Sequence, residues 1–129
     1  MYTMLVYINA SINGFTSKGA FVKIEFATLD LQHICENEKL MKKKFGMCTN
    51  KLKTRIADLM AATNVGELAA GQPHPLKYKR LGQFSVSVSG GLRLIFECGN
   101  NPTPRMDNNA IDWKQVTIVR ILSIEDYHE

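Results

Sequence analysis

The sequence predicts an α+β domain, with two helices packed on one face of a mainly antiparallel sheet of about four strands. Three observations favour this class: an alternating polar and apolar segment near residue 22, two amphipathic helix-length segments before residue 63, and three later runs of β-prone residues. A chain of 129 residues suits one such domain and is too short for two ordinary ones. We therefore expect a single domain at residues 21–129 and an N-terminal extension at residues 1–20, which lacks the basic start of a signal peptide.

The first strand and the first helix follow from local patterns. Residues Phe21–Phe26 alternate between apolar and charged side chains, as in a strand with one buried face. Thr28 or Asp30 then caps a helix that Gly46 ends, and the lysines at 42–44 suit the negative end of that helix. Its inward positions are predicted to be Leu31, Ile34, Cys35, Met41 and Phe45.

A second helix is predicted over roughly residues 48–63, with one apolar stripe and with most of its basic residues off that stripe. Because a single glycine separates the two helices, we expect an antiparallel helical hairpin. Residues 64–82 are expected to be a connector, since glycine and proline recur along them, with at most one helical turn near Glu67–Ala70.

Gly90-Gly91 is the strongest turn signal in the chain and predicts a two-residue turn between two strands. With uninterrupted pairing, Ser89 would face Leu92 and Val88 would face Arg93. The same register pairs Ser87 with Leu94, Ser85 with Phe96, Val86 with Ile95, and Phe84 with Glu97. Neither face is uniformly polar, so this hairpin is expected to lie inside the sheet.

The end of the chain is predicted to contain a long loop and a central strand. Residues 99–115 are longer than a hairpin connection needs, and Pro102 and Pro104 exclude a central strand there. The last strand, Val116–Ile124, is apolar on both sides with few exceptions and is therefore predicted to be central.

The positive charge is concentrated in the middle of the chain. Residues 39–93 hold eleven lysines and arginines against two acidic residues, a local charge of +9, whereas the whole chain carries +4. This favours a polyanionic partner such as nucleic acid or an acidic protein. The alternative is a solvated helix surface rich in lysine.

Composition also limits the cofactors and the compartment. The three cysteines (Cys35, Cys48 and Cys98) lack the spacing of a zinc site or a disulfide framework, so we expect no metal, no cofactor and a reducing cytoplasm. No window approaches the ~18 apolar residues of a membrane span. An apolar share of 45% and a charged share of 22% are typical of a folded protein and argue against wholesale disorder.

The remaining candidates for chemistry are a basic loop, one hairpin arginine and the chain end. Cleaving RNA without a metal needs a base for the 2′-hydroxyl, an acid for the leaving oxygen and cations on the phosphate. His128 suits proton transfer, with Tyr127 as a partner. The basic loop and Arg93 suit the phosphate. These groups form one site only if the last strand pairs beside the hairpin.

Each of these residues also has a simpler interpretation. A histidine near a C-terminus is exposed and without a role in most proteins, which is the simpler interpretation of His128. His74 has the alternative role of holding its loop by a backbone hydrogen bond. Arg93 has Glu97 or Asp126 as possible ion-pair partners. Trp113 has two interpretations: it stacks on a base, or it caps an edge of the core.

Taken together, HPLKYKRLGQFSVSVSGGLRLIFE and a terminal strand ending IEDYH resemble the HigB branch of the RelE/ParE-type toxins of bacterial toxin–antitoxin pairs. The likeness covers about residues 21–129 and includes the order of elements. It implies a small cytoplasmic endoribonuclease that cuts mRNA in the ribosome and arrests growth. It implies as partners a helix-turn-helix antitoxin, the ribosome and mRNA, with operator DNA bound only through the antitoxin complex.

By this resemblance, the family's loop lysine falls on Lys77 and its hairpin arginine on Arg93, while its closing D-Y-H falls on Asp126, Tyr127 and His128. His128 would be the principal acid and base, Tyr127 would position the RNA, and Asp126 would orient its neighbours. The residues expected at the phosphate or the RNA are Lys77, Lys79, Arg80 and Arg93, with His74 in the loop and Lys51 and Lys53 on the second helix.

The chain departs from the family pattern at several positions. Tyr78 stands where the family has glycine, and Ser89 where some members have a basic residue. Phe84 and Leu92 replace the usual tryptophans. Two other functions therefore stay open. The first is a non-catalytic member that binds a partner or operator DNA. The second is a ParE-like toxin that acts on DNA gyrase, although the terminal histidine argues against it.

Overall fold

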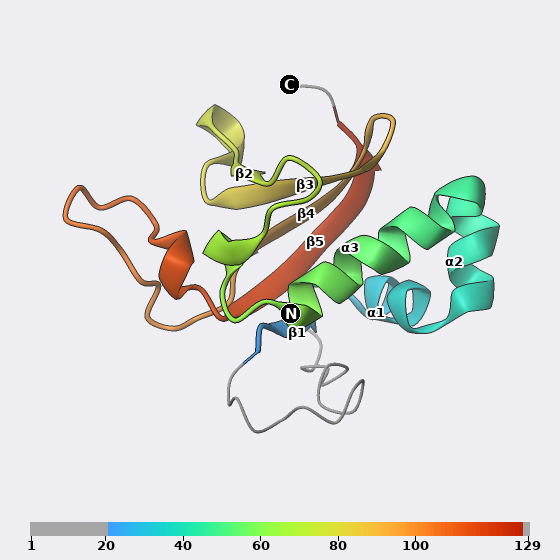
Figure 1. The fold of residues 1–129 in the computed structure, drawn as a ribbon, viewed down its shortest axis with the longest axis horizontal. Helices are drawn as coiled ribbons and strands as arrows, with labels where there is room; N and C mark the ends of the chain where they lie inside the picture. The colour runs from blue at the N-terminus through green and yellow to red at the C-terminus, as the bar shows by residue number, and fades with distance from the viewer. Residues whose placement is uncertain (1–20, 128–129) are drawn as a thin grey trace.

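The computed structural model describes residues 21–127 and shows a five-stranded sheet with three α-helices on one side of it (Figure 1). The extension at residues 1–20 and the last two residues, His128 among them, lie outside the described residues. In chain order the elements are β1 (Lys23–Phe26), α1 (Leu29–Glu36), α2 (Glu38–Phe45), α3 (Thr49–Ala61), β2 (His74–Pro75), β3 (Gln83–Ser89), β4 (Leu92–Cys98) and β5 (Ile118–Asp126). The predicted α+β class is confirmed.

The strands follow the order β1-β5-β4-β3-β2. β5 pairs with β1 in parallel and with β4 antiparallel, and the other pairings are antiparallel. The prediction of a central last strand is therefore confirmed, although β5 ends at Asp126 instead of Ile124. The predicted sheet of about four strands gains a fifth, because His74–Pro75 adds a short ladder at the edge of β3.

The helical layer differs from the predicted two-helix hairpin, because the first predicted helix is broken at Asn37. Thr28 caps α1, as expected, by accepting a hydrogen bond from the Leu31 amide. Asn37 has extended backbone, and its side-chain oxygen accepts from the amides of Lys39 and Leu40, so it starts a new helix. Gly46, with φ +53°, then ends α2 as predicted.

This break turns most of the first helix away from the centre of the core. Of the five inward positions predicted for it, Met41 is buried, while Leu31, Ile34, Cys35 and Phe45 pack partly buried against the core. Burial raises the pKa of the Cys35 thiol to about 12, with a smaller contribution from the nearby Glu36 charge, so that thiol stays protonated at neutral pH.

The hairpin register is shifted by one residue relative to the prediction. Ser89 faces Leu92 as expected, but Ser87 and not Val88 pairs with Arg93, because β3 contains a β-bulge between Ser87 and Ser89. The observed pairs beyond the bulge are Val86 with Leu94, Ser85 with Ile95, Phe84 with Phe96, and Gln83 with Glu97.

The bulge has a clear physical cause. Without it, Val86 and Val88 of β3 would share a face with Arg93 of β4. With it, both valines join the buried cluster that contains Leu94 and Phe96 and packs against the helices. Burying apolar side chains of this size stabilises the fold by about 1.5–3 kcal/mol each, which outweighs the loss of regular pairing at one residue.

Candidate functional site

The candidate site lies on the sheet face that points away from the helices, at the end near the Gly90-Gly91 turn. Leu94 belongs to the core, so the preceding residue, Arg93, lies on the opposite face. Its cross-strand neighbours are Ser87 on β3 and Glu125 on β5. The strand register thus puts one cation of the predicted set at the centre of a polar row.

The Arg93 guanidinium is only partly satisfied. Its Nε donates to the backbone oxygen of Tyr127 at 3.4 Å, while its Nη1 is buried and has no hydrogen-bond partner among the described residues. A buried donor without a partner costs about 1–3 kcal/mol, and more when it is charged. The alternative partner Glu97 is bound by Arg120 at 2.9 Å. Arg93 therefore presents a donor that a bound anion would satisfy.

The last described residues, up to Tyr127, lie directly beside the hairpin. β5 pairs with β4 to its last residue, with Asp126 opposite Leu92 (Figure 1). The Tyr127 amide donates to the Gly91 backbone oxygen at 3.0 Å, and its carbonyl accepts from Arg93. Both polar groups of this peptide segment are thus engaged with the hairpin, and the exposed Asp126 carboxylate lies at its edge.

Arg80 joins the basic loop to the chain end. Its guanidinium forms two hydrogen bonds with Glu125, at 2.9 and 3.3 Å, and a third with Gln83 at 3.1 Å. It also lies 4.5 Å from the centre of the Tyr127 ring, within cation–π range. The hydrogen bonds from Arg80 hold the pKa of Glu125 below its usual value despite partial burial, and Glu125 in turn raises the pKa of Arg80.

Glu125 is the site residue that the sequence analysis missed. It accepts hydrogen bonds from Arg80 and from the Ser123 hydroxyl, and it lies opposite Arg93 in the sheet. The alternation of Ser123 and Glu125 on one side of β5 was a signal for a polar face at this end of the strand. The charge of Arg80, for which a phosphate contact is predicted, is paired with Glu125 in this structure.

The other loop residues lie near Arg80 with fewer constraints. Lys77 precedes a short 3-10 turn, η4 (Tyr78–Arg80), and both Lys77 and Lys79 are exposed. Tyr78 adopts φ +56° with 90% of its surface exposed, so the backbone keeps a left-handed conformation that favours glycine. The His74 ring lies 2.7 Å from the Gln72 backbone oxygen, in agreement with the simpler interpretation of this histidine.

The two helix lysines are not brought together with Arg93. Lys51 and Lys53 belong to α3, in the helix layer on the opposite face of the sheet, and both are exposed. Lys53 forms an ion pair with Glu38 at 2.8 Å, and Lys42 reaches the same carboxylate at 3.2 Å. These two lysine contacts hold the pKa of Glu38 below its usual value.

Trp113 packs against the edge of the core. It begins a 3-10 turn, η5 (Trp113–Gln115), and its ring centroid lies 4.7 Å from that of Phe84 and 6.5 Å from that of Phe96. Phe84 and Phe96 stack on each other at 5.2 Å. The core-edge interpretation of this tryptophan therefore holds, and the long loop is attached to the domain through it.

The described residues hold neither a metal-binding cluster nor a membrane-spanning helix. Within residues 21–127, no three His, Cys, Asp or Glu side chains are grouped so that they would hold a metal ion. Over the same residues, no helix combines the length and the apolar character needed to cross a bilayer.

Comparison with known proteins gives similarity at the level of structure. No protein-family model matches the chain, and no curated protein matches it in sequence. A YoeB/ParE toxin from Agrobacterium tumefaciens is similar with a TM-score of 0.47 and 11% identity, over 72% of this chain and 88% of that one. The YoeB dimer and the YoeB–YefM complex from Staphylococcus aureus give TM-scores of 0.49 and 0.48, each with 17% identity over 85% of this chain and 100% of theirs.

Proposed function

We propose that this protein is the toxin of a type II toxin–antitoxin pair and acts as a ribosome-dependent mRNA endoribonuclease that needs no metal. The HigB-like motifs at His74–Glu97 and Ile124–His128 support this proposal. The observation that carries it is the Arg93 guanidinium, buried at Nη1 without a partner among residues 21–127 and held beside the backbone of Tyr127. A charged donor in this state suits an anionic ligand that is supplied by the substrate.

In the proposed reaction, the 2′-hydroxyl oxygen attacks the adjacent phosphorus and the 5′-oxygen leaves. His128 takes the hydroxyl proton or returns one to the leaving oxygen, since histidine titrates near neutral pH. Arg93 and Lys77 neutralise the charge that develops on the phosphate. Asp126 orients its neighbours.

The contacts of Arg80 change its proposed role. Its charge is paired with Glu125, and its guanidinium carbon lies 4.5 Å from the centre of the Tyr127 ring. We therefore propose that Arg80 holds Tyr127 in place for contact with the RNA, and that Lys77, Lys79 and Arg93 supply the charge at the phosphate, with His74 keeping the loop in shape.

The proposed partners use other surfaces. The exposed lysines of the helix layer, including Lys51 and Lys53, would contact ribosomal RNA or an acidic segment of a helix-turn-helix antitoxin in the cytoplasm. Such contacts should weaken steeply with added salt, because they depend on the release of counterions. Operator DNA would be bound only through the antitoxin complex.

The test is induced expression in bacteria, followed by mapping of cleavage sites in ribosome-bound mRNA. The wild type should stop growth and translation, and His128→Ala should relieve the arrest and lower cleavage by at least about 100-fold, the usual contribution of one acid–base group. His33→Ala, on α1, is the matched control and should remain toxic. A harmless wild type that leaves mRNA intact would refute the nuclease proposal.

A non-catalytic binding protein is the second candidate, favoured by one observation. Glu125 neutralises Arg80, which leaves fewer unpaired cations for a transition state than the sequence suggested. In that case Arg93→Ala would weaken binding to RNA or to a partner, while the wild type would show no cleavage. A supercoiling assay with DNA gyrase separates both candidates from a ParE-like toxin.

A further inference from the structure

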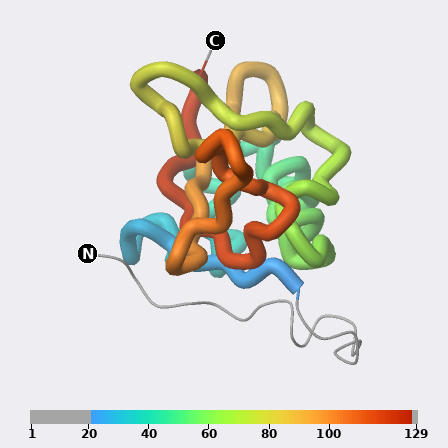
Figure 2. The backbone as a smooth tube through the Cα atoms, turned by 90° about the vertical axis from the view of Figure 1, so that its left-hand side faces the viewer, coloured from blue at the N-terminus to red at the C-terminus, as the bar shows by residue number. Residues whose placement is uncertain are grey.

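A pocket of about 450 Å³ lies between the connector and the 99–115 loop, next to the candidate site. The loop lies at one end of the sheet (Figure 1), and Figure 2 shows it in orange below the yellow-green part of the connector. The lining is largely apolar and contains no acidic residue; it consists of Pro75, Leu76, Lys77, Leu81, Gly82, Arg105, Asn109, Ala110, Ile111 and Trp113.

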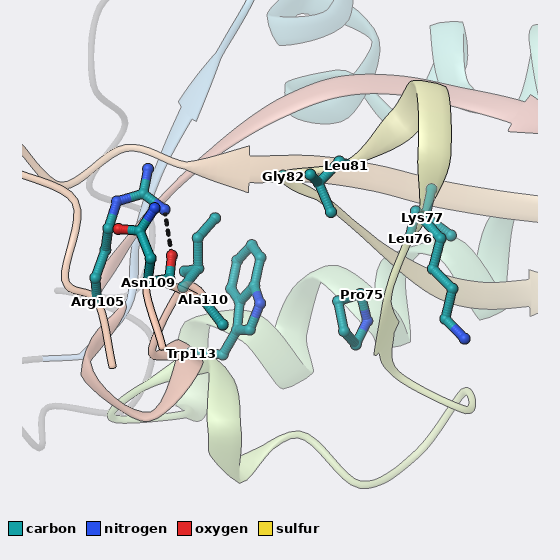
Figure 3. Close-up of a pocket in the computed structure, with 10 residues that line it drawn as sticks. Pro75, Leu76, Lys77, Leu81, Gly82, Arg105, Asn109, Ala110 and Trp113 are labelled. Carbon is teal, nitrogen blue, oxygen red and sulfur yellow. Dashed lines mark hydrogen bonds between the residues drawn. The ribbon is translucent and has the colours of Figure 1, made fainter. Parts of the chain in front are cut away.

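The wall that the loop contributes is held by its own hydrogen bonds. Arg105 and Ile111 form an isolated β-bridge, and the Arg105 guanidinium donates to the Asn109 backbone oxygen at 2.9 Å (Figure 3). At the base of the loop, the Asn100 side chain binds the amides of Thr117 and Ile118 at 3.0 Å each. The pocket is therefore formed before any ligand enters, which lowers the entropy lost on binding.

Trp113 belongs both to the core edge and to this pocket. Its ring packs on Phe84 and Phe96, and the same side chain lines the cavity. Figure 3 shows the indole in the middle of the pocket, with Pro75 on one side and Ala110 on the other. A tryptophan supported from behind presents a rigid aromatic surface of the kind on which nucleobases stack.

Two cations stand at the ends of the pocket. Arg105 lies at one end and Lys77 at the other (Figure 3), and both are exposed. An apolar, aromatic centre between two positive charges fits a flat, uncharged ring whose connecting chain carries negative charge on each side. Single-stranded RNA has this chemistry, since every base lies between two phosphates.

We infer that this pocket binds one base of the RNA substrate, stacked on Trp113, with the flanking phosphates on Lys77 and Arg105. The inference rests on the proposed function, because it takes RNA as the ligand. Lys77 connects the two sites, since it lines the pocket and also belongs to the loop that ends in Arg80. A segment of an acidic protein is the competing occupant, and the experiment below distinguishes it.

The chain provides its own reporter, because Trp113 is its single tryptophan. Tryptophan emission of the full-length protein would be titrated with a short 2′-O-methyl oligoribonucleotide, which lacks the attacking hydroxyl and stays intact. Saturable quenching is expected, and an oligonucleotide with an abasic site at the bound position should bind about tenfold more weakly, equivalent to about 1.4 kcal/mol. Equal quenching by both oligonucleotides would overturn the inference.

Pocket variants make the test specific. Ala110→Phe would fill the cavity from an exposed position and should abolish the difference between the two oligonucleotides, whereas Ala57→Phe, on an exposed part of α3, should preserve it. Circular dichroism would verify that both variants fold. Unchanged discrimination in a folded Ala110→Phe variant contradicts the inference, as does an acidic peptide that quenches the emission when RNA does not.

The two proposals fail separately. Base-dependent quenching without any mRNA cleavage would refute the nuclease but support the pocket as an RNA site. Cleavage that persists without base-dependent quenching would refute the pocket alone. Arg105→Gln adds an independent check of the pocket, because it should weaken binding of the intact oligonucleotide, and an unchanged affinity in this variant would contradict the inference.

Discussion

Two arginines lie on the same face of the same sheet, and they differ in the carboxylates that bind them. Arg120 is bound by Glu25 at 3.1 Å and by Glu97 at 2.9 Å, with 17% of its side chain exposed. Arg93, nearer the other end of the face, has one hydrogen bond to a backbone oxygen and a buried Nη1 without a partner in the described chain. Two carboxylates bind the first arginine, whereas no carboxylate among residues 21–127 forms an ion pair with the second, in keeping with the anion role proposed for it.

The difference follows from what lies opposite each arginine in the sheet. The cross-strand neighbours of Arg120 are Glu25 on β1 and Glu97 on β4, and both bind it. Arg93 also has a carboxylate neighbour, Glu125, but Arg80 of the connector binds that carboxylate with two hydrogen bonds. Because Arg80 binds Glu125, no carboxylate of the described residues is bound to Arg93. A loop residue thus decides which of two similar sheet positions becomes a candidate site.

The largest effect is expected from Arg93→Gln. Removing a charged donor from a developing phosphate charge should lower mRNA cleavage by roughly 100-fold or more. Stability should change by less than about 0.5 kcal/mol, because the variant also removes a buried unsatisfied group. The measurements are cleavage of ribosome-bound mRNA and thermal unfolding, with Arg93→Lys as a control that keeps the charge. Full activity in Arg93→Gln would contradict the contrast drawn between the two arginines.

Arg120→Met should have the opposite effects, with a large loss of stability and little change in activity. It leaves Glu25 and Glu97 without their shared cation, and we expect a loss of about 2–3 kcal/mol of unfolding free energy, less than for a fully buried pair because both carboxylates are partly exposed. Activity per folded molecule should stay near that of the wild type. Adding Glu25→Gln and Glu97→Gln should restore much of the stability, as measured by urea unfolding. No recovery in this combined variant would mean that packing, and not charge, holds Arg120 in place.

Glu125→Gln should have a smaller effect on stability than Arg120→Met, and that effect should depend on pH. The folded pKa of Glu125 lies below its ordinary value of 4.5, so its ion pair stabilises the fold above about pH 5 and is lost as the pH falls through the folded pKa. The variant should therefore be less stable at pH 7, by at most about 1 kcal/mol for a pair this exposed, and the stabilities of the two proteins should converge as the pH falls through the folded pKa of Glu125. If the free energies of unfolding of the two proteins differ by the same amount from pH 7 to pH 3, the ion pair does not stabilise the fold as proposed.

Local patterns were sufficient to predict much of the fold. The alternation at the first strand, the Thr28 cap, the stop at Gly46 and the apolar last strand each depend on neighbours in sequence, and the structure has all four. The bulge at Val88 was not predictable in this way. Pairing with and without the bulge uses the same turn, and only the burial of the β3 valines against helices far away in sequence decides between them.

Some features of the candidate site could likewise be predicted from local sequence patterns, and others could not. The position of Arg93 and the approach of the chain end followed from the hairpin and the central strand. The contact between Arg80 and Glu125 joins residues 45 positions apart through an irregular loop, and no periodicity encodes it. Asn37 is intermediate: asparagine is a good cap, but an uninterrupted helical pattern on both sides concealed the break.

The β3–β4 hairpin, with its bulge at Val88, and the loop at residues 99–115 differ in their tolerance of insertions and deletions. Deleting Val88, the single residue between Ser87 and Ser89, would restore regular pairing but remove a buried valine. Deleting Ser85 would move Phe84 from the core to the face of Arg93. Length changes within residues 99–115 have no such effect, because Asn100 fixes the start of β5 from the base of the loop. Descendants of this sequence are therefore free to vary in loop length, and with it in what the pocket accepts, while the hairpin must keep its number of residues.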